Sequence, residues 1–261
     1  MIFIDSHTHL YLENFDSDRN QVMENAISKG IKFMLLPAID KSTFKEMKLM
    51  TNEFPENCFP MIGVHPTSIK ENYLEEIELV ETELEKGGYC AIGEIGIDLY
   101  WDKTFEEQQK VAFRHQLQLA KKYKLAVAIH MRDSFDDVYK IVKEEQDGKL
   151  KGVFHCFTGD LEDAKKIMEL GFYLGIGGIV TFKNSGQDKI VKDIPLESIL
   201  LETDSPFLTP TPFRGKRNES AYIKLIAEKI AEVKNINIEQ IAETTTNNCI
   251  ALFNLKLNIN Q

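Results

Sequence analysis

The sequence has few of the features that mark secreted, membrane-bound or polyanion-coating proteins. Only four of its 261 residues are cysteines, and no two of them form a C-x-x-C pair of the kind that binds zinc or cycles as a redox dithiol. No apolar run approaches the roughly 18 residues of a membrane span, and the N-terminus lacks the basic start and long apolar stretch of a signal peptide. We therefore expect a cytoplasmic protein that does not contact a membrane.

Basic residues are also scarce relative to acidic ones. The chain has 31 lysines and arginines against 41 acidic residues, a formal charge of -10, which argues against a broad basic face. Residues 71–85 hold seven glutamates and no lysine or arginine. Because Leu74, Ile77, Val80 and Leu84 follow helical spacing, these glutamates are expected to face solvent on an outer helix. A polyanionic substrate would then be held at one small patch.

Short apolar runs alternate with longer amphipathic stretches along the whole chain, and no linker is long enough to separate domains. Strands are predicted at residues 3–9, 32–38, 59–65, 90–96, 126–130, 152–156, 172–178 and 199–203. Helices are predicted at 20–29, 44–52, 74–85, 106–123, 135–145, 161–170 and 221–233, with a short one at 186–193 and a closing one at 238–253. Eight such units predict the α/β class and one (β/α)8 TIM barrel domain over residues 1–261. A doubly wound open sheet, the alternative, usually has a glycine-rich turn after its first strand, where this chain has His-Thr-His.

Five of the six histidines end predicted strands, and only His115 lies within a predicted helix. The C-terminal strand ends form the active face of such a barrel, so polar residues gathered there are candidates for chemistry. His7 and His9 are two apart on one predicted strand and would project from the same face, where they could share a metal ion. A lone His-x-His pair also occurs by chance.

Carboxylates occupy similar positions. Glu94 ends the fourth predicted strand between two glycines, where it could bridge two cations, and Asp204 follows the eighth, with Glu202 on the same side. Each of these residues, taken alone, also fits a solvated side chain, a turn cap or a core histidine. As a group at the ends of five strands they favour a metal centre. The predicted ligands are His7, His9, Glu94, His130, His155 and Asp204.

This donor set indicates which ions to expect. Imidazole and carboxylate ligands without thiolate suit Zn, Mn, Fe, Co or Ni, and Mg where oxygen ligands and water dominate. Six ligands are too many for one catalytic ion, so we expect one or two divalent ions with Glu94 as the bridge. Mg or Mn is expected in turnover, with Zn, Ni or Fe as alternatives. A pair of ions can activate a water and stabilise both oxygens of an in-line displacement.

Several short motifs occur in order along the chain: DSHTHL at 5–10, GVHP at 63–66, GEIGID at 93–98, HCFTG at 155–159, VTFKN at 180–184, ETDSP at 202–206 and RGKRN at 214–218. With them the sequence resembles the TatD family of metal-dependent deoxyribonucleases, within the amidohydrolase-like barrels. The resemblance implies the same six ligands and hydrolysis of phosphodiester bonds. Two positions depart from the family pattern. Met131 stands where a small residue is usual, and Ser220 stands where proline is frequent. Met131 is expected to point away from the barrel interior.

The resemblance also implies roles for residues beside the metals. Asp204 would accept the proton of the attacking water, Glu94 would bridge the ions, and Glu202 would orient a ligand or water. The substrate would be DNA, as single strands or frayed ends, cut in an exonuclease-like manner with no obligate protein partner. Residues suited to substrate phosphate are His65, Arg132, Lys183, Arg214, Lys216 and Arg217.

Two other functions remain open from the sequence. A barrel hydrolase for a small phosphoester, amide or lactone could use the same metal and scaffold. Relatives of that kind with a carboxylated lysine bridge would place Lys where this chain has Glu94, which disfavours the amide and lactone branch. A non-catalytic barrel that binds nucleic acid or a partner would be expected to lack a ligand, and none is missing here.

Overall fold

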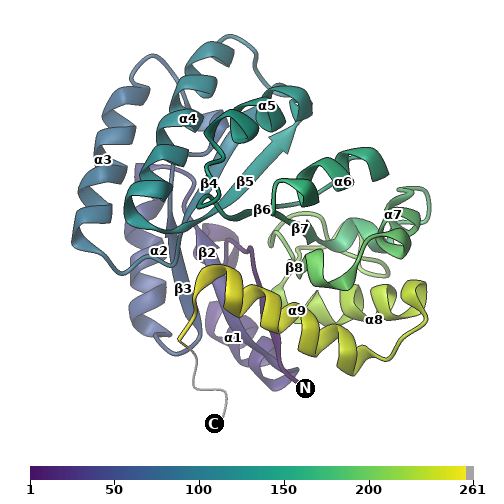
Figure 1. Ribbon diagram of the computed structural model, residues 1–261. Helices are drawn as coiled ribbons and strands as arrows, with labels where there is room; N and C mark the ends of the chain where they lie inside the picture. Colours follow the sequence, from purple (N-terminus) through teal and green to yellow (C-terminus); the bar gives the residue numbers. More distant parts are fainter. Residues whose placement is uncertain (257–261) are drawn as a thin grey trace.

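Eight parallel strands surrounded by helices form a barrel in the computed structural model, which describes residues 1–256 (Figure 1). The strands are β1 (Phe3–Asp5), β2 (Ile31–Pro37), β3 (Cys58–Ile62), β4 (Ala91–Asp98), β5 (Ala126–Arg132), β6 (Gly152–Phe154), β7 (Tyr173–Ile176) and β8 (Ile199–Leu201). Each strand pairs with the next one along the chain. At the remaining seam, the Ser6 N–H donates to the Leu201 carbonyl and the Asp204 N–H donates to the His7 carbonyl, both at 2.9 Å. The predicted single-domain TIM barrel is confirmed.

The helices alternate with the strands as predicted. They are α1 (Arg19–Ser28), α2 (Lys41–Glu53), α3 (Tyr73–Lys86), α4 (Glu106–Tyr123), α5 (Phe135–Glu145), α6 (Leu161–Glu169), α7 (Gln187–Asp193), α8 (Ile223–Lys234) and α9 (Ile238–Phe253). Short 3-10 turns lie at Glu13–Phe15, Pro66–Ser68, Gly178–Thr181, Leu196–Ser198 and Ser220–Tyr222. Within residues 1–256, no helix combines the length and apolar character that crossing a bilayer requires.

The closing helix α9 covers the N-terminal end of the barrel. Its Cys249, Leu252 and Phe253 pack with inward-facing strand residues such as Leu35 and Leu200 in one buried apolar cluster. Polar side chains of α9 also bind the strand starts, since the Thr246 hydroxyl donates to the Ile2 carbonyl at 3.0 Å. The barrel interior is therefore closed and apolar at this end, and its polar side chains lie at the C-terminal end.

Several strands end earlier than the sequence predicts, which corrects the placement of the first two histidines. β1 ends at Asp5, so His7 and His9 lie in the segment beyond it and not on the strand. There the His9 N–H donates to the Ser205 carbonyl at 2.8 Å, and the Thr8 N–H donates to the Leu35 carbonyl at 3.1 Å. Hydrogen bonds to neighbouring segments replace the strand ladder and hold both imidazoles at the mouth of the barrel.

The outer face of α3 also differs from the prediction at two positions. Leu74, in the first turn, is 58% exposed, whereas Glu76 is only 6% exposed. Glu76 is drawn inward by α2, because its carboxylate accepts the Lys41 N–H at 3.3 Å and pairs with Lys41 Nζ at 3.0 Å. A carboxylate at a helix N-terminus is stabilised by the unpaired N–H groups there.

Met131 on β5 points away from the barrel interior, as predicted, since it packs against the apolar core around the barrel.

Candidate metal centre

Glu94 lies at the centre of a polar cluster at the C-terminal mouth of the barrel. It is on β4, and its side chain is 4% exposed. One carboxylate oxygen, Oε2, lies 3.2 Å from His7 Nε2 and 3.5 Å from His9 Nε2. Asp204 Oδ1 is 3.5 Å from the same His9 nitrogen and 3.9 Å from His7 Nε2. The segments that follow β1 and β8 thus supply one set of donors on one side of Glu94.

The other oxygen of Glu94 faces a different set of imidazoles. Oε1 lies 2.7 Å from His155 Nε2, 2.9 Å from His130 Nδ1 and 3.3 Å from His65 Nε2. His65, which the family resemblance places close to the metals and which was predicted as a substrate contact, therefore stands among the predicted ligands. A carboxylate whose two oxygens face separate groups of donors has the arrangement of a bridging ligand between two ions.

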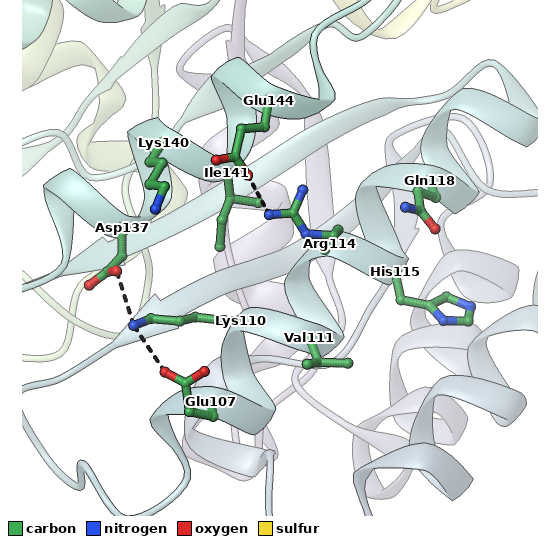
Figure 2. A pocket seen from close by; sticks show the side chains of 10 residues that line it. All are labelled: Glu107, Lys110, Val111, Arg114, His115, Gln118, Asp137, Lys140, Ile141 and Glu144. Carbon is green, nitrogen blue, oxygen red and sulfur yellow. Dashed lines mark hydrogen bonds and ion pairs between the residues drawn. The ribbon is translucent and has the colours of Figure 1, made fainter.

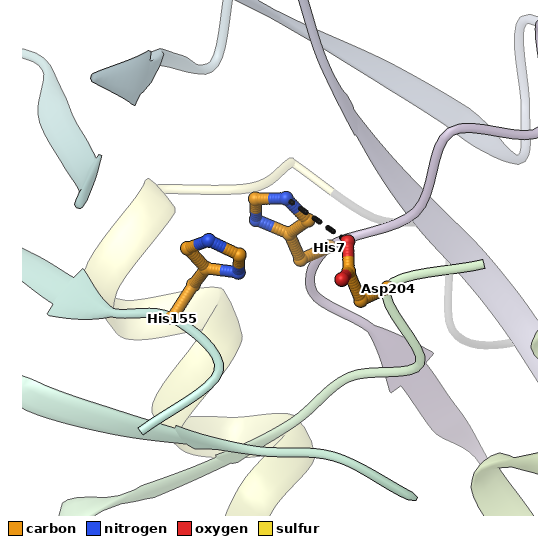
Figure 3. A group of neighbouring side chains, drawn as sticks. All are labelled: His7, His155 and Asp204. Atoms are coloured by element: carbon orange, nitrogen blue, oxygen red, sulfur yellow. Dashed lines mark ion pairs between the residues drawn. The ribbon is translucent and has the colours of Figure 1, made fainter. Parts of the chain in front are cut away.

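The two groups of donors adjoin through His7 and His155. Their rings stack with centroids 3.9 Å apart and an interplanar angle of 7°. Together with Asp204 they form a further triplet whose ligand atoms lie within 4.8 Å of one another, and Figure 3 shows these side chains gathered at the mouth. The structure thus brings together all six residues that the sequence predicts as metal ligands.

Burial and neighbouring charges together shift the pKa values of these groups. Burial, together with the charge of His155, lowers the pKa of His7 to about 4, so its imidazole is neutral and able to bind a cation. Burial also disfavours a charged His155, but the carboxylate of Glu94 outweighs it and raises the pKa to about 9. Burial opposes ionisation of Glu94 as well, yet the surrounding imidazoles, His155 foremost, hold the pKa of Glu94 well below its usual range.

This charge pattern and the chemistry of the donor set fit a divalent ion. The ionised carboxylate needs positive charge beside it, which a bound cation supplies without protonating the imidazoles. Among the described residues, the Nδ1 atoms of His7 and His155 are buried without a hydrogen-bond partner. Histidine nitrogens and carboxylate oxygens without thiolate are the donors that Zn, Mn, Fe, Co and Ni accept.

Two side chains that the sequence reasoning did not single out hold the imidazoles in place. Asp98 Oδ2 lies 2.8 Å from His130 Nε2, which leaves the Nδ1 atom of His130 facing Glu94. The Tyr11 hydroxyl lies 2.9 Å from His9 Nδ1 and donates to the Pro37 carbonyl at 2.7 Å. Such partners fix the ring orientation and tautomer of a ligating histidine. Two signals in the sequence could have identified these residues. Asp98 lies in the GEIGID motif, and Tyr11 follows His9 by two residues.

Glu202 lies behind His155. The Glu202 carboxylate accepts the Cys156 N–H, and its Oε1 is 3.8 Å from His155 Nδ1. Burial raises the pKa of Glu202 to about 8. A Cβ at Gly175 would collide with this carboxylate, so only glycine leaves room for it there. Glu202 therefore lies behind a predicted ligand without a hydrogen bond to it, and its role in orienting a ligand or water stays a prediction.

The predicted phosphate-binding residues have different surroundings. The guanidinium of Arg132 lies 3.8 Å from the ring centroid of Tyr100, and that of Arg214 lies 4.0 Å from that of Phe182. Arg217 instead forms a bidentate ion pair with Asp18, with both N–O distances at 2.7 Å. Lys183 and Lys216 are exposed. Contact with substrate phosphate stays a prediction for these residues, and for Arg217 it competes with an existing ion pair.

A surface groove between α4 and α5 lies on the outer helices (Figure 2). Its charges largely satisfy one another, since Lys110 pairs with Asp137 at 3.0 Å and with Glu107 at 3.3 Å. Arg114 pairs with Glu144 at 2.6 Å across the groove. His115, the histidine predicted to lie in a helix, is on α4 at its rim. This groove joins two helices and does not contribute to the metal centre.

Comparison with known proteins places this barrel in a family. The family model "TatD related DNase" matches residues 4–254. The chain belongs to the TatD family. It is 41% identical over 256 residues to YabD of Bacillus subtilis, described as an uncharacterized metal-dependent hydrolase, covering 98% of this chain and 100% of YabD. It is 35% identical to the similarly described YcfH of Escherichia coli, covering 98% of this chain and 97% of YcfH.

Solved structures of TatD relatives have the same fold. The crystal structure of YjjV, a TatD homologue from Escherichia coli, superposes with a TM-score of 0.91 at 29% identity, covering 97% of this chain and 98% of YjjV. A TatD family hydrolase from Entamoeba histolytica superposes with a TM-score of 0.83 at 26% identity, covering 97% of this chain and 98% of that one. The protein is thus a metal-dependent hydrolase of the TatD type.

Proposed function

We propose that this TatD-family hydrolase is a deoxyribonuclease that cuts phosphodiester bonds in an exonuclease-like manner, at single-stranded or frayed DNA ends. The observation that carries the proposal is the position of Glu94, whose two oxygens face two separate groups of imidazoles. Sites for two ions are typical of enzymes that displace an oxygen at phosphorus. The description of the matching family as a DNase supports DNA as the substrate.

The residues would hold one or two divalent ions, as described above, with Glu94 between them. Ions bound there would polarise the phosphoryl oxygen and lower the pKa of water enough for it to attack phosphorus. Asp204 is the carboxylate suited to accept the proton of that water, because its Oδ1 lies at the mouth within 3.5 Å of His9. Asp98, 2.8 Å from His130 Nε2, would keep that ring oriented from behind, and Glu202 would orient a ligand or water beside His155.

The proposal extends to the ion and the compartment. Mg or Mn is the expected ion in turnover, and the many imidazoles also suit Zn, Ni or Fe. Four free thiols and the absence of a disulfide among residues 1–256 support a cytoplasmic location.

Charge favours a substrate bound at one small site. The chain carries a formal charge of -10, so a long duplex would gain little from the outer surface. Positive charge at the mouth would come from bound divalent ions and from basic side chains on the loops around them. Weak binding of duplex DNA at physiological salt is therefore part of the proposal.

The test compares turnover of a 5′-labelled single-stranded oligonucleotide with turnover of a panel of small esters, lactones and phosphotriesters. The proposal expects metal-dependent cleavage of the oligonucleotide to dominate. It also expects Asp204→Asn to abolish that cleavage, while Asp102→Asn, on an exposed loop, leaves it intact. Efficient turnover of a small ester without oligonucleotide cleavage would instead establish a small-molecule hydrolase.

A further inference from the structure

Two large aromatic side chains stand exposed beside the metal centre. Tyr100 is 53% exposed and Trp101 is 69% exposed, on the segment that joins β4 to α4 at the mouth. Their rings meet edge to face, with centroids 4.9 Å apart and an interplanar angle of 88°. Adjacent exposed apolar groups that form a contiguous patch often mark a binding surface. Neither ring belongs to the metal ligands described above, so the metal centre does not account for their exposure.

The same carboxylate holds both this aromatic segment and a predicted metal ligand. Asp98 Oδ1 accepts the N–H of Tyr100 at 3.0 Å and that of Trp101 at 3.3 Å, while Oδ2 lies 2.8 Å from His130 Nε2. Asp98 is itself only 2% exposed. The position of the rings is therefore tied to the position of His130, although the rings themselves are open to solvent.

Arg132 covers the two rings from the neighbouring strand. It is two residues after His130 on β5, so both side chains project from the same face of the strand. Its guanidinium carbon lies 3.8 Å from the ring centroid of Tyr100 and 5.3 Å from that of Trp101. Arg114 and Arg217, by contrast, are paired with carboxylates. The guanidinium of Arg132 thus lies against aromatic rings and not against a carboxylate.

We propose that Tyr100, Trp101 and Arg132 form a stacking platform for an unpaired base adjacent to the phosphodiester bond at the metal centre. The inference rests on the proposed nuclease function and names the part of the substrate that this surface reads. An aromatic ring binds any base through its face, and arginine adds attraction for both the base and the phosphate backbone. A base inside a duplex has both faces covered by its neighbours. The platform therefore selects single strands and frayed ends without selecting a base sequence.

Trp101 is the single tryptophan of the chain and reports directly on stacking. The metal-loaded enzyme is titrated with single-stranded oligonucleotides carrying phosphorothioate linkages to slow cleavage, while tryptophan emission is recorded. Saturable quenching is expected with the normal oligonucleotide. An abasic strand of equal length, and a blunt duplex, should bind with little quenching, binding being followed by the anisotropy of a terminal dye. Equal quenching by the abasic strand, or binding of the normal strand without quenching, would overturn the proposal.

Kinetics of substituted enzymes provide a second test. Trp101→Ala is expected to raise KM for a single-stranded oligonucleotide about tenfold, with kcat little changed, because the loss of base stacking on one ring is expected to cost about 1.4 kcal/mol of binding. Trp101→Phe should retain most of the affinity, and Leu74→Ala, at another exposed apolar position but on α3, should change nothing. Unchanged KM in Trp101→Ala would contradict the platform even if the enzyme is a nuclease. An enzyme that cuts no oligonucleotide refutes the nuclease proposal, and the quenching result then decides the platform by itself.

Discussion

The two ends of the barrel are built on the same eight strands but contain opposite chemistry. At the N-terminal end, Leu35 and Leu200 are fully buried and pack with Leu252 and Phe253 of α9. At the C-terminal end, Glu94 is just as deeply enclosed, but its neighbours are imidazoles. Burying apolar side chains stabilises a fold, whereas burying ionised groups costs free energy unless partners compensate. The apolar end therefore stabilises the barrel, whereas the buried charges of the polar end lower its stability.

The seam between β1 and β8 shows how the polar end is kept folded. Asp5 is completely buried there, and burial raises its pKa to about 7. Its carboxylate accepts the Thr203 hydroxyl at 2.6 Å and the Thr203 N–H at 2.9 Å. Buried polar groups with satisfied hydrogen bonds can define one geometry for the segments they join. Substitutions at the two ends should consequently separate activity from stability.

Replacing the central carboxylate should have the largest effect and should affect activity. Glu94→Gln removes the charge that both groups of imidazoles face, so we expect metal-dependent hydrolysis to fall by about 10³-fold or more. Without added metal, its urea unfolding midpoint should change less than that of a variant at the apolar end. Steady-state rates and urea unfolding measure the two quantities. A Glu94→Gln enzyme that unfolds early yet keeps its rate would reverse the roles assigned to the two ends.

The matching substitution at the apolar end is Leu35→Ala. It creates a cavity in the closed interior beneath α9, and we expect the free energy of unfolding to fall by about 2–5 kcal/mol. The rate per folded molecule should be unchanged, because Leu35 is not among the donors at the mouth. Leu74→Ala, at an exposed position, serves as the control and should shift stability by about 0.5 kcal/mol or less. A large loss of rate in folded Leu35→Ala protein would show that the two ends are not separable.

A smaller effect is expected behind the ligands. Asp98→Asn keeps the shape of the side chain but removes the charge beside His130 Nε2, and we expect affinity for the metal ion to fall about 10- to 100-fold. Calorimetric titration of the metal-stripped protein with Mn measures this affinity. The control is Asp102→Asn, four residues further along in the exposed segment that follows β4, which should bind as the wild type does. Equal losses in both variants would point to the loop as a whole and not to the contact with His130.

The smallest effect concerns the outer ring, at Glu83 on α3. Burial by itself would raise the pKa of Glu83, but hydrogen bonds from Lys48, Lys86 and Tyr89 lower it to about 2. A carboxyl with a depressed pKa stabilises the fold above its unfolded pKa, and this contribution is lost as the pH falls from about 5 towards 2. Glu83→Gln should therefore reduce the acid-dependent loss of stability in that window, by about 1 kcal/mol or less. Urea unfolding at neutral and acidic pH measures it, with exposed Glu85→Gln as the control.

Much of the barrel and of the donor set was predictable from the sequence because both depend on local patterns. Apolar runs at regular intervals indicated eight strands, and polar residues at their ends indicated the ligands His7, His9, Glu94, His130, His155 and Asp204. The strand ends were less predictable. His7 and His9 still reach Glu94 from beyond β1, because the segment after the strand is held by hydrogen bonds to other loops.

Contacts between distant segments were not predictable. The partnership of Asp98 with His130 depends on the register of β4 against β5, which pairs Asp98 with Arg132. The inward turn of Glu76 depends on the N-terminus of α2, which helical spacing within α3 does not reveal. The placement of the Trp101 backbone depends on Asp98, whose carboxylate accepts its N–H. Each of these features follows from how two elements meet and not from the pattern of either one.

The most direct test of the account is an add-back assay on metal-stripped protein. Labelled single-stranded and double-stranded oligonucleotides are incubated with the stripped enzyme alone and after addition of Mg, Mn or Zn. We expect no cleavage without metal, cleavage from the ends of single strands restored by Mg or Mn, and slower attack on blunt duplexes. Cleavage that is equally fast without metal, or no cleavage of either DNA with any ion, would contradict it.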